Sequence, residues 1–250
     1  MSRALSFRFL GVGNAKASDL GSAAAVLEED GKPLLLVDCG PRTLDDFARH
    51  YGDTLPSAVF LTHLHLDHIG GVEQLFYRAY FARRGEIQLF VPSWLVAGLH
   101  EKLATSPHVL SEGGANFWDA FHLVPTSGHF WLGPYLLDVF PVRHSGYRAA
   151  FGLALRGSFF YSGDTRPIPE VVGSFATAGE PIFHDCAVRG SPAHTGLEDV
   201  LREYPEEVRA RIVAYHYESE TAAQALEQAG LRVARVDESF TLPRPRSLQA

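Results

Sequence analysis

The sequence predicts an α/β fold in which two β-sheets pack together and helices lie on the outside. Apolar stretches of strand length recur along the 250 residues, and segments with a helical pattern lie between them. Several of the apolar stretches are continuous rather than alternating, which is typical of strands covered on both faces. No stretch has the composition of a linker. We therefore expect a single domain over residues 1–250.

The predicted strands share their length and their apolar character. In chain order they are Leu5–Leu10, Ala23–Leu27, Leu34–Val37, Ala58–Leu61, Ile87–Val91, Leu136–Val142, Phe151–Leu155, Phe159–Tyr161, Pro181–Phe183, Ile212–Ala214 and Val233–Val236. Strands dominate the opening of the chain, whereas strands and helices mix toward its close.

Helical patterns occupy the spaces between these strands. In Gly71–Arg84 the apolar residues recur at a spacing that places them on one face of a helix. Ser93–Thr105 begins just after a proline. Thr195–Tyr204 opens with a threonine suited to the N-cap, has Glu198 three residues later as a capping box, and stops before a proline. Glu218–Gly230 is closed by a glycine.

Composition narrows the classes of protein that this chain can be. A formal net charge of −7 speaks against a protein that coats nucleic acid, because such proteins need a broad basic surface. The two cysteines, Cys39 and Cys186, argue against a disulfide scaffold and fit a reducing compartment. No stretch approaches the ~20 apolar residues that cross a bilayer, and Arg3 and Arg8 interrupt the N-terminal apolar run. We therefore expect a cytoplasmic protein that does not enter a membrane.

The run His-x-His-x-Asp-His carries the strongest chemical signal. It is formed by His63, His65, Asp67 and His68 and follows the predicted strand Ala58–Leu61. The first two histidines are two residues apart, so on an extended segment they project to the same side. Three imidazoles and a carboxylate suit zinc, with manganese, iron or nickel as alternatives. A chance histidine-rich turn of this pattern would arise in roughly one sequence per thousand.

Further ligands are expected from elsewhere in the chain. His144, Asp164 and His216 each stand at the carboxyl end of an apolar strand, so one edge of the fold could collect them. Taken singly, each is better explained as a hydrogen-bonded residue at a strand end. Together with the first run, they are better explained as metal ligands.

On these residues the sequence resembles the metallo-β-lactamase superfamily. The resemblance implies a four-layer αββα sandwich of two mixed β-sheets with outer helices, and a site for two divalent metal ions. By position it assigns the ligands of the first ion to His63, His65 and His144. It assigns those of the second to Asp67, His68 and His216, with Asp164 bridging both.

Other segments resemble the ribonuclease Z-like phosphodiesterase branch of that superfamily. Phe9–Asn14 and Leu36–Gly40 match its strand motifs. The resemblance implies that Asp38 orients a ligand histidine through the second ring nitrogen. Within the branch, the sequence is most similar to small cyclic-nucleotide phosphodiesterases, including the anti-Pycsar enzymes that destroy cyclic pyrimidine nucleotides.

One further element of the branch is a histidine that faces the scissile phosphate. Ala193-His194-Thr195-Gly196 matches it, which makes His194 the candidate general acid or phosphate-binding residue. The alternative is an ordinary loop residue before a helix. For His184, a buried histidine bonded to the backbone is as good an interpretation as a catalytic one.

The resemblance implies hydrolysis of a small nucleotide phosphodiester, most simply a 3′,5′-cyclic mononucleotide to the mononucleotide. Asp67 and Asp164 would accept the proton of the attacking water, and His194 would protonate the departing oxygen. It further implies a homodimer without an extensive nucleic-acid surface. The arginines open as phosphate contacts are Arg143, Arg148, Arg166 and Arg189.

Three alternative functions stay open. A transfer-RNA 3′-processing endonuclease would need a long, often basic arm, and the sequence contains no basic arm. A thioesterase or lactonase of the same fold would attack a carbonyl instead of a phosphate. A non-catalytic nucleotide sensor would be expected to lack metal ligands.

The segment Ser106–Pro134 is rich in glycine and proline and is too long for a simple turn. It carries the aromatic residues Phe117, Trp118, Phe130 and Trp131. One hypothesis is that this loop closes over the nucleotide and stacks on its base. The other is that the rings cover the core or a dimer contact.

Overall fold

The computed structural model describes residues 3–105, 109–110 and 113–245. Within these residues two mixed sheets of seven strands each form the centre of the molecule. The first sheet has the order β16-β1-β2-β3-β4-β5-β8. Its strands are β1 (Leu5–Gly11), β2 (Ala24–Glu29), β3 (Lys32–Val37), β4 (Ala58–Phe60), β5 (Ile87–Pro92), β8 (Phe121–Thr126) and β16 (Ser239–Thr241).

The second sheet has the order β15-β14-β13-β12-β11-β10-β9. Its strands are β9 (His129–Leu132), β10 (Tyr135–Pro141), β11 (Phe151–Leu155), β12 (Phe159–Tyr161), β13 (Ile182–Asp185), β14 (Ile212–Tyr215) and β15 (Arg232–Val233). A separate short pair joins β6 (Val109–Leu110) to β7 (Gly113–Gly114).

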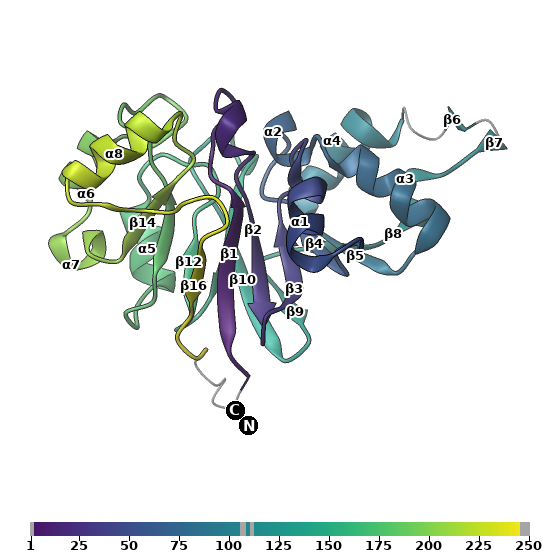
Figure 1. The fold of residues 1–250 in the computed structure, drawn as a ribbon, viewed down its shortest axis with the longest axis horizontal. Coiled ribbons are helices and arrows are strands. Elements are labelled where there is room, and N and C mark those ends of the chain that lie inside the picture. Colours follow the sequence, from purple (N-terminus) through teal and green to yellow (C-terminus); the bar gives the residue numbers. More distant parts are fainter. Residues whose placement is uncertain (1–2, 106–108, 111–112, 246–250) are drawn as a thin grey trace.

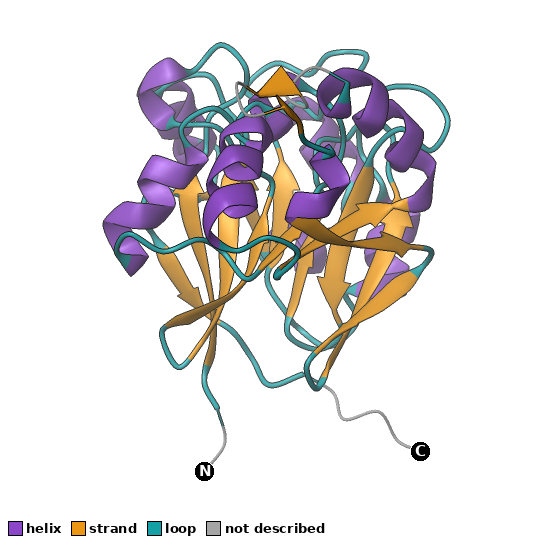
Figure 2. Ribbon diagram, turned by 90° about the vertical axis from the view of Figure 1, so that its right-hand side faces the viewer, coloured by secondary structure: helices purple, strands orange, loops and turns teal. Residues whose placement is uncertain are grey.

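Helices lie outside the strands (Figure 2). They are α1 (Thr43–Tyr51), α2 (Leu66–Ile69), α3 (Val72–Ala82), α4 (Val96–Leu99), α5 (Pro169–Phe175), α6 (Leu197–Glu203), α7 (Glu206–Arg209) and α8 (Glu220–Gln228). Helices α1 and α3 lie beside the first sheet, and α5, α6 and α8 lie beside the second (Figure 1). No helix in the described ranges is long and apolar enough to cross a bilayer.

Aromatic side chains pack the two sheets together. Phe7 of β1 stacks on Phe183 of β13 with ring centroids 4.8 Å apart, and Phe90 of β5 stacks on Phe130 of β9 at 4.2 Å. Each ring pair joins one sheet to the other, and such pairs stabilise a core beyond the area that they bury. The four-layer αββα sandwich predicted from the sequence is therefore the observed architecture.

Strand direction determines where the functional residues gather. Strands β3 and β4 are parallel, as are β12, β13 and β14. Their carboxyl ends therefore lie at one edge of each sheet, which is where α/β folds bind ligands. Asp38 directly follows β3, and His216 directly follows β14.

The predicted start of one helix is wrong. Helix α6 begins at Leu197, and its N-cap is Gly196 rather than Thr195. The hydroxyl of Thr195 donates instead to the carbonyl oxygen of Thr165 at 2.7 Å. The carboxylate that accepts the N-cap N–H belongs to Asp199, at 3.0 Å, and not to Glu198. Because its hydroxyl makes this tertiary hydrogen bond, Thr195 does not cap the helix.

The prediction of a continuous loop over residues 106–134 is also wrong. Its second half forms β8 and β9, and Phe117 and Phe130 are buried in the core. For these two rings the core hypothesis is correct, and they cannot close over a nucleotide. Trp118 is partly buried beside His100, whereas the side chain of Trp131 is exposed. Residues 106–108 and 111–112 of the predicted loop lie outside the described residues.

Candidate metal centre

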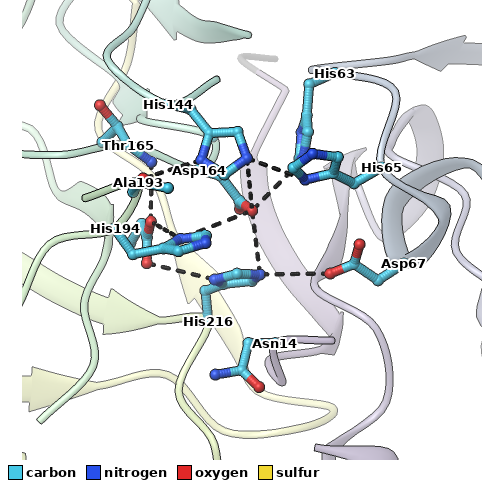
Figure 3. Close-up of polar contacts among 12 residues, drawn as sticks. Asn14, His63, His65, Asp67, His144, Asp164, Thr165, Ala193, His194 and His216 are labelled. Atoms are coloured by element: carbon cyan, nitrogen blue, oxygen red, sulfur yellow. Dashed lines mark hydrogen bonds and ion pairs between the residues drawn. The ribbon is translucent and has the colours of Figure 1, made fainter. Parts of the chain in front are cut away.

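The candidate site is assembled from strand ends at one edge of the sandwich (Figure 3). His63 and His65 follow β4, whereas Asp67 and His68 lie in the short helix α2. A close backbone approach fixes this turn, because a Cβ on Gly40 would lie 2.1 Å from the carbonyl oxygen of Asp67. Only glycine allows the chain after β3 to pack so tightly against the histidine-rich segment.

Asp164 stands at the centre of the site. Its Oδ2 lies 3.3 Å from Nε2 of His68 and 3.3 Å from Nε2 of His216. The same oxygen lies 3.5 Å from Nε2 of His63 and 3.9 Å from Nε2 of His144. The side chain of Asp164 is 1% exposed, so these rings surround a carboxylate that water hardly reaches.

The residues predicted to hold metal fall into two groups. In each group the possible ligand atoms lie within 4.8 Å of one another. The first group contains His63, His65, His144 and Asp164, and the second contains Asp67, His68 and His216. The structure therefore brings together every residue that the sequence analysis names as a metal ligand, and a third group joins Asp164 and His216 to His194.

Hydrogen bonds to the other ring nitrogens fix the orientation of the histidines. Nδ1–H of His68 donates to Oδ2 of Asp38 at 2.8 Å, where the sequence analysis places an orienting carboxylate. The Thr62 hydroxyl also donates to that oxygen at 2.7 Å, so it accepts from Nδ1–H of His63 at 3.0 Å. Nδ1–H of His144 donates to the carbonyl oxygen of Ala193 at 2.9 Å. Such partners hold the Nε2 lone pairs toward a metal.

Buried polar atoms without a partner test whether a metal fits here. Nε2 of His63, His68 and His216 and Oδ1 of Asp164 are buried and accept or donate no hydrogen bond among the described residues. Buried polar atoms are normally paired, so four orphans in one place need an explanation. Divalent cations ligated by these atoms would satisfy them, and imidazole with carboxylate is a donor set that zinc accepts.

The electrostatics of the site lead to the same conclusion. Burial raises the pKa of Asp164, but the facing histidines outweigh burial and hold that pKa well below its usual range. Burial lowers the pKa of His216, yet Asp164, Asp185 and Asp67 together raise it to about 10. The proton that His216 retains thus balances part of the carboxylate charge, and a bound cation would take the place of that proton.

Asp185 contacts the candidate site, and the sequence analysis assigns it no role. Its Oδ2 accepts from Nδ1–H of His194 at 2.8 Å and from the N–H of Thr165 at 2.9 Å. Burial lowers the pKa of His194, but the bond to Asp185 outweighs it, so that the pKa of His194 is raised. In the sequence Asp185 stands at the end of an apolar strand, directly after His184.

His184 lies beside Asp185 in the chain but has a structural role. Its ring is buried, Nδ1–H donates to the carbonyl oxygen of Asp185 at 2.7 Å, and Nε2 accepts from the Tyr204 hydroxyl at 2.7 Å. Of the two interpretations left open for His184, the buried and hydrogen-bonded one is correct.

A cavity of about 440 Å³ opens beside these residues. His65, Asp67, Asp164, His194 and His216 line one part of it. The other walls come from the turn at 14–16, from residues 187 and 189–191, and from residue 218. Lys16 and Arg189 therefore bring positive charge to the cavity, and Glu218 brings negative charge.

Among the four arginines left open as phosphate contacts, only Arg189 lines this cavity. Arg143 donates to the carbonyl oxygen of Pro167 and pairs with Glu170. Arg148 lies over exposed aromatic rings, and Arg166 lines a neighbouring cavity.

Known proteins are similar to this chain over most of its length. A family model described as "Anti-Pycsar protein Apyc1" matches residues 5–240. A curated relative of that name from Paenibacillus harenae is 29% identical over 218 residues, which cover 84% of this chain and 88% of the relative.

Solved structures show the same fold at low sequence identity. The metallo-β-lactamase fold protein YhfI from Bacillus subtilis is 12% identical with a TM-score of 0.73, covering 95% of this chain and 99% of that one. A diphosphatase from the PhnP family is 15% identical with a TM-score of 0.77, covering 94% and 97%. The metallo-β-lactamase fold predicted from the sequence is thus confirmed.

Proposed function

The chain belongs to the anti-Pycsar protein Apyc1 family, and from this premise we propose that it hydrolyses a 3′,5′-cyclic mononucleotide to the linear mononucleotide. The family and the fold identify the chain as a metal-dependent phosphodiesterase, which is a hydrolase. One observation carries the proposal of a metal-dependent reaction at this site. It is the set of buried imidazole nitrogens around Asp164 that form no hydrogen bond with any described residue.

We propose that the two groups of ligands each hold one divalent ion. His63, His65 and His144 would bind the first, Asp67, His68 and His216 the second, and Asp164 faces both groups. Zinc is the ion that best suits this donor set. When bound, two such ions polarise a phosphate oxygen and lower the pKa of water toward neutrality.

Asp67 is the better placed of the two proposed proton acceptors. Its side chain is 17% exposed and lines the cavity, whereas that of Asp164 is 1% exposed. Burial raises the pKa of Asp67, but contacts with His216 and His68 outweigh it, so that the pKa is lowered. The carboxylate is therefore ionised at neutral pH and can take a proton from water that enters the cavity.

His194 is proposed as the general acid. Because Asp185 accepts from Nδ1–H, the Nε2 atom is left for the substrate, and the raised pKa favours the protonated ring. The side chain is 29% exposed, far more than the buried histidines around Asp164, so a leaving group could reach it. General acid catalysis of this kind contributes about 10²- to 10⁴-fold.

The walls of the cavity favour a small phosphate ester as substrate. Lys16 and Arg189 line it, and charged donors of this kind bind phosphate oxygens. A net charge of −7 disfavours a long RNA substrate, which needs an extended basic surface. For these reasons we place the cyclic mononucleotide before the transfer-RNA processing reaction.

A substrate panel tests the proposal. The protein is assayed with cyclic mononucleotides, cyclic dinucleotides, a precursor transfer RNA, a thioester and a lactone, and metal content is measured on the same sample. We expect turnover of cyclic mononucleotides by protein that carries two equivalents of metal. Cleavage of the thioester or lactone alone, or binding of a cyclic nucleotide without turnover, would contradict the proposal. The homodimer implied by the family resemblance is checked by sedimentation of that sample.

A further inference from the structure

Two large aromatic side chains are exposed on one surface of the protein. Trp94 is 59% exposed and Tyr147 is 79% exposed, and their ring centroids lie 6.0 Å apart at an interplanar angle of 85°. The guanidinium of Arg148 lies 5.0 Å from the centroid of the Trp94 ring and 5.2 Å from that of the Tyr147 ring. We name Trp94, Tyr147 and Arg148 the aromatic corner. Clustered exposed rings are typical of binding surfaces.

The aromatic corner lies near the metal centre. Tyr147 follows His144 by three residues, so their Cα atoms are at most ~11 Å apart. Trp94 lies just before α4, and α4 packs on the histidine-rich segment, since a Cβ on Gly98 would lie 2.8 Å from Cδ1 of Leu64. In Figure 1, α2 and α4 lie along the same edge of the molecule.

Arg148 is held in an unusual conformation. Its φ is +52°, which residues other than glycine adopt rarely. Among the described residues, no carboxylate lies within ion-pair distance of its guanidinium, which instead contacts the two rings. Strained residues cluster at ligand sites, and here the strain holds a cation against the aromatic faces.

We propose that the aromatic corner binds the base of the nucleotide whose phosphate lies at the metal centre, an inference that rests on the proposed function. A nucleobase is a flat π-system, and it stacks on aromatic rings and on guanidinium planes. The tether between base and phosphate is short, which matches the position of the corner beside His144. The corner would thus supply affinity for the nucleotide while the cavity beside Asp164 supplies the chemistry.

The test compares two ligands that differ only in the base. Hydrolysis of a cyclic mononucleotide by the metal-loaded full chain is measured with a nucleoside 5′-monophosphate or ribose 5-phosphate as inhibitor. For Trp94→Ala and Tyr147→Ala we expect the inhibition constant of the nucleotide to rise about 5- to 150-fold. At about 1.4 kcal/mol per tenfold change this equals the ~1–3 kcal/mol of one stacked base. The constant for ribose 5-phosphate and the metal content should not change.

Tryptophan fluorescence gives a second readout that needs no turnover. Adding the nucleoside monophosphate should quench the wild-type signal, and Trp94→Phe should lose that quench. Trp131→Phe is the matched control, because Trp131 is 54% exposed but lies opposite Leu136, near the start of β10, whereas His144 follows the end of that strand. The control should keep the quench.

The outcomes separate the base subsite from the proposed reaction. If the wild type cleaves cyclic nucleotides but the variants bind both ligands unchanged, the reaction stands and the subsite is wrong. If binding of both ligands falls equally, the corner has a structural role and the subsite is wrong. A change in sedimentation without a change in affinity would make the corner a contact between copies. A base-dependent quench without turnover would support the subsite and contradict the reaction.

Discussion

Asp185 contacts two histidines with one carboxylate. Oδ2 accepts from Nδ1–H of His194 at 2.8 Å, and Oδ1 lies 3.4 Å from Nδ1 of His216. One of these rings is the proposed general acid, and the other is a proposed metal ligand. The carboxylate therefore orients His194 through a hydrogen bond and lies close to His216, and it raises the pKa of both despite their burial.

Asp185→Asn should lower kcat about 10- to 100-fold, the usual effect of removing a partner that orients such histidines. The amide cannot support a protonated His194, so the limb of the pH profile that reports this residue should move to lower pH. Steady-state kinetics across pH measure both effects. Asp138→Asn is the control. Asp138 lies in β10, forms an ion pair with Arg156 and does not line the cavity. An unchanged pH profile of kcat in Asp185→Asn would show that the contact between Asp185 and His194 does not contribute to the reaction.

His194→Ala should lower kcat by about 10²- to 10⁴-fold and leave the metal content unchanged. The reason is that the proposed ligands are complete without His194. The geometry also allows the opposite result, because Asp164, His194 and His216 form a third group of possible ligand atoms within 4.8 Å of one another. Metal analysis of the purified variant decides the matter. Loss of an ion would identify His194 as a ligand rather than an acid.

Gly40→Ala should destabilise the fold and weaken metal binding together. The added Cβ would lie 2.1 Å from the carbonyl oxygen of Asp67, so the turn that carries Asp67 must move. Overpacking of this kind costs about 1–3 kcal/mol. Denaturant unfolding and metal titration measure the two effects. Gly173→Ala in α5 is the control, since its Cβ would meet nothing within 4 Å and should not lower stability. A stable Gly40→Ala protein with normal metal affinity would show that the turn can adapt.

The proposed metal ligands could be identified from the sequence because each follows an apolar strand or lies in one dense motif. Asp185 could not be identified with the same rule. It shares the end of β13 with His184, and alternate residues of a strand face opposite sides. The sequence does not reveal which of the two faces the site. Only the packing of β13 between β12 and β14 directs Asp185 toward His194.

The missed strands have a different cause. β8 and β9 lie in a segment rich in glycine and proline, which predicts a loop. Strand β8 forms because it pairs in parallel with β5 at the edge of the first sheet, where a proline such as Pro125 is tolerated. Pairing between distant segments determines these strands, and local composition does not report it.

Glu28 connects elements from both ends of the chain. Oε1 accepts from Nε of Arg8 at 2.9 Å and from the Tyr51 hydroxyl at 2.7 Å, and Oε2 accepts from the Ser6 hydroxyl at 2.6 Å. The Ser239 hydroxyl of β16 also donates to Oε2, at 3.3 Å. Burial raises the pKa of Glu28, but these donors outweigh burial, so that the pKa is lowered in the folded protein.

Glu28→Gln should lower the free energy of unfolding at pH 7 by about 1.5–3 kcal/mol, because hydrogen bonds to a charged group are lost. A lowered folded-state pKa stabilises the protein above the unfolded-state pKa of about 4.3, and this contribution is lost as the pH falls through the folded-state value. In denaturant unfolding, the difference in the free energy of unfolding between wild type and variant should therefore decrease below about pH 4.3. Glu86→Gln is the control, because Glu86 is 61% exposed in its pair with Arg83 and should change stability little at any pH. A difference in the free energy of unfolding that stays constant down to pH 3 would show that the packing of the Glu28 side chain, and not its charge, stabilises the contacts among β1, β2 and α1.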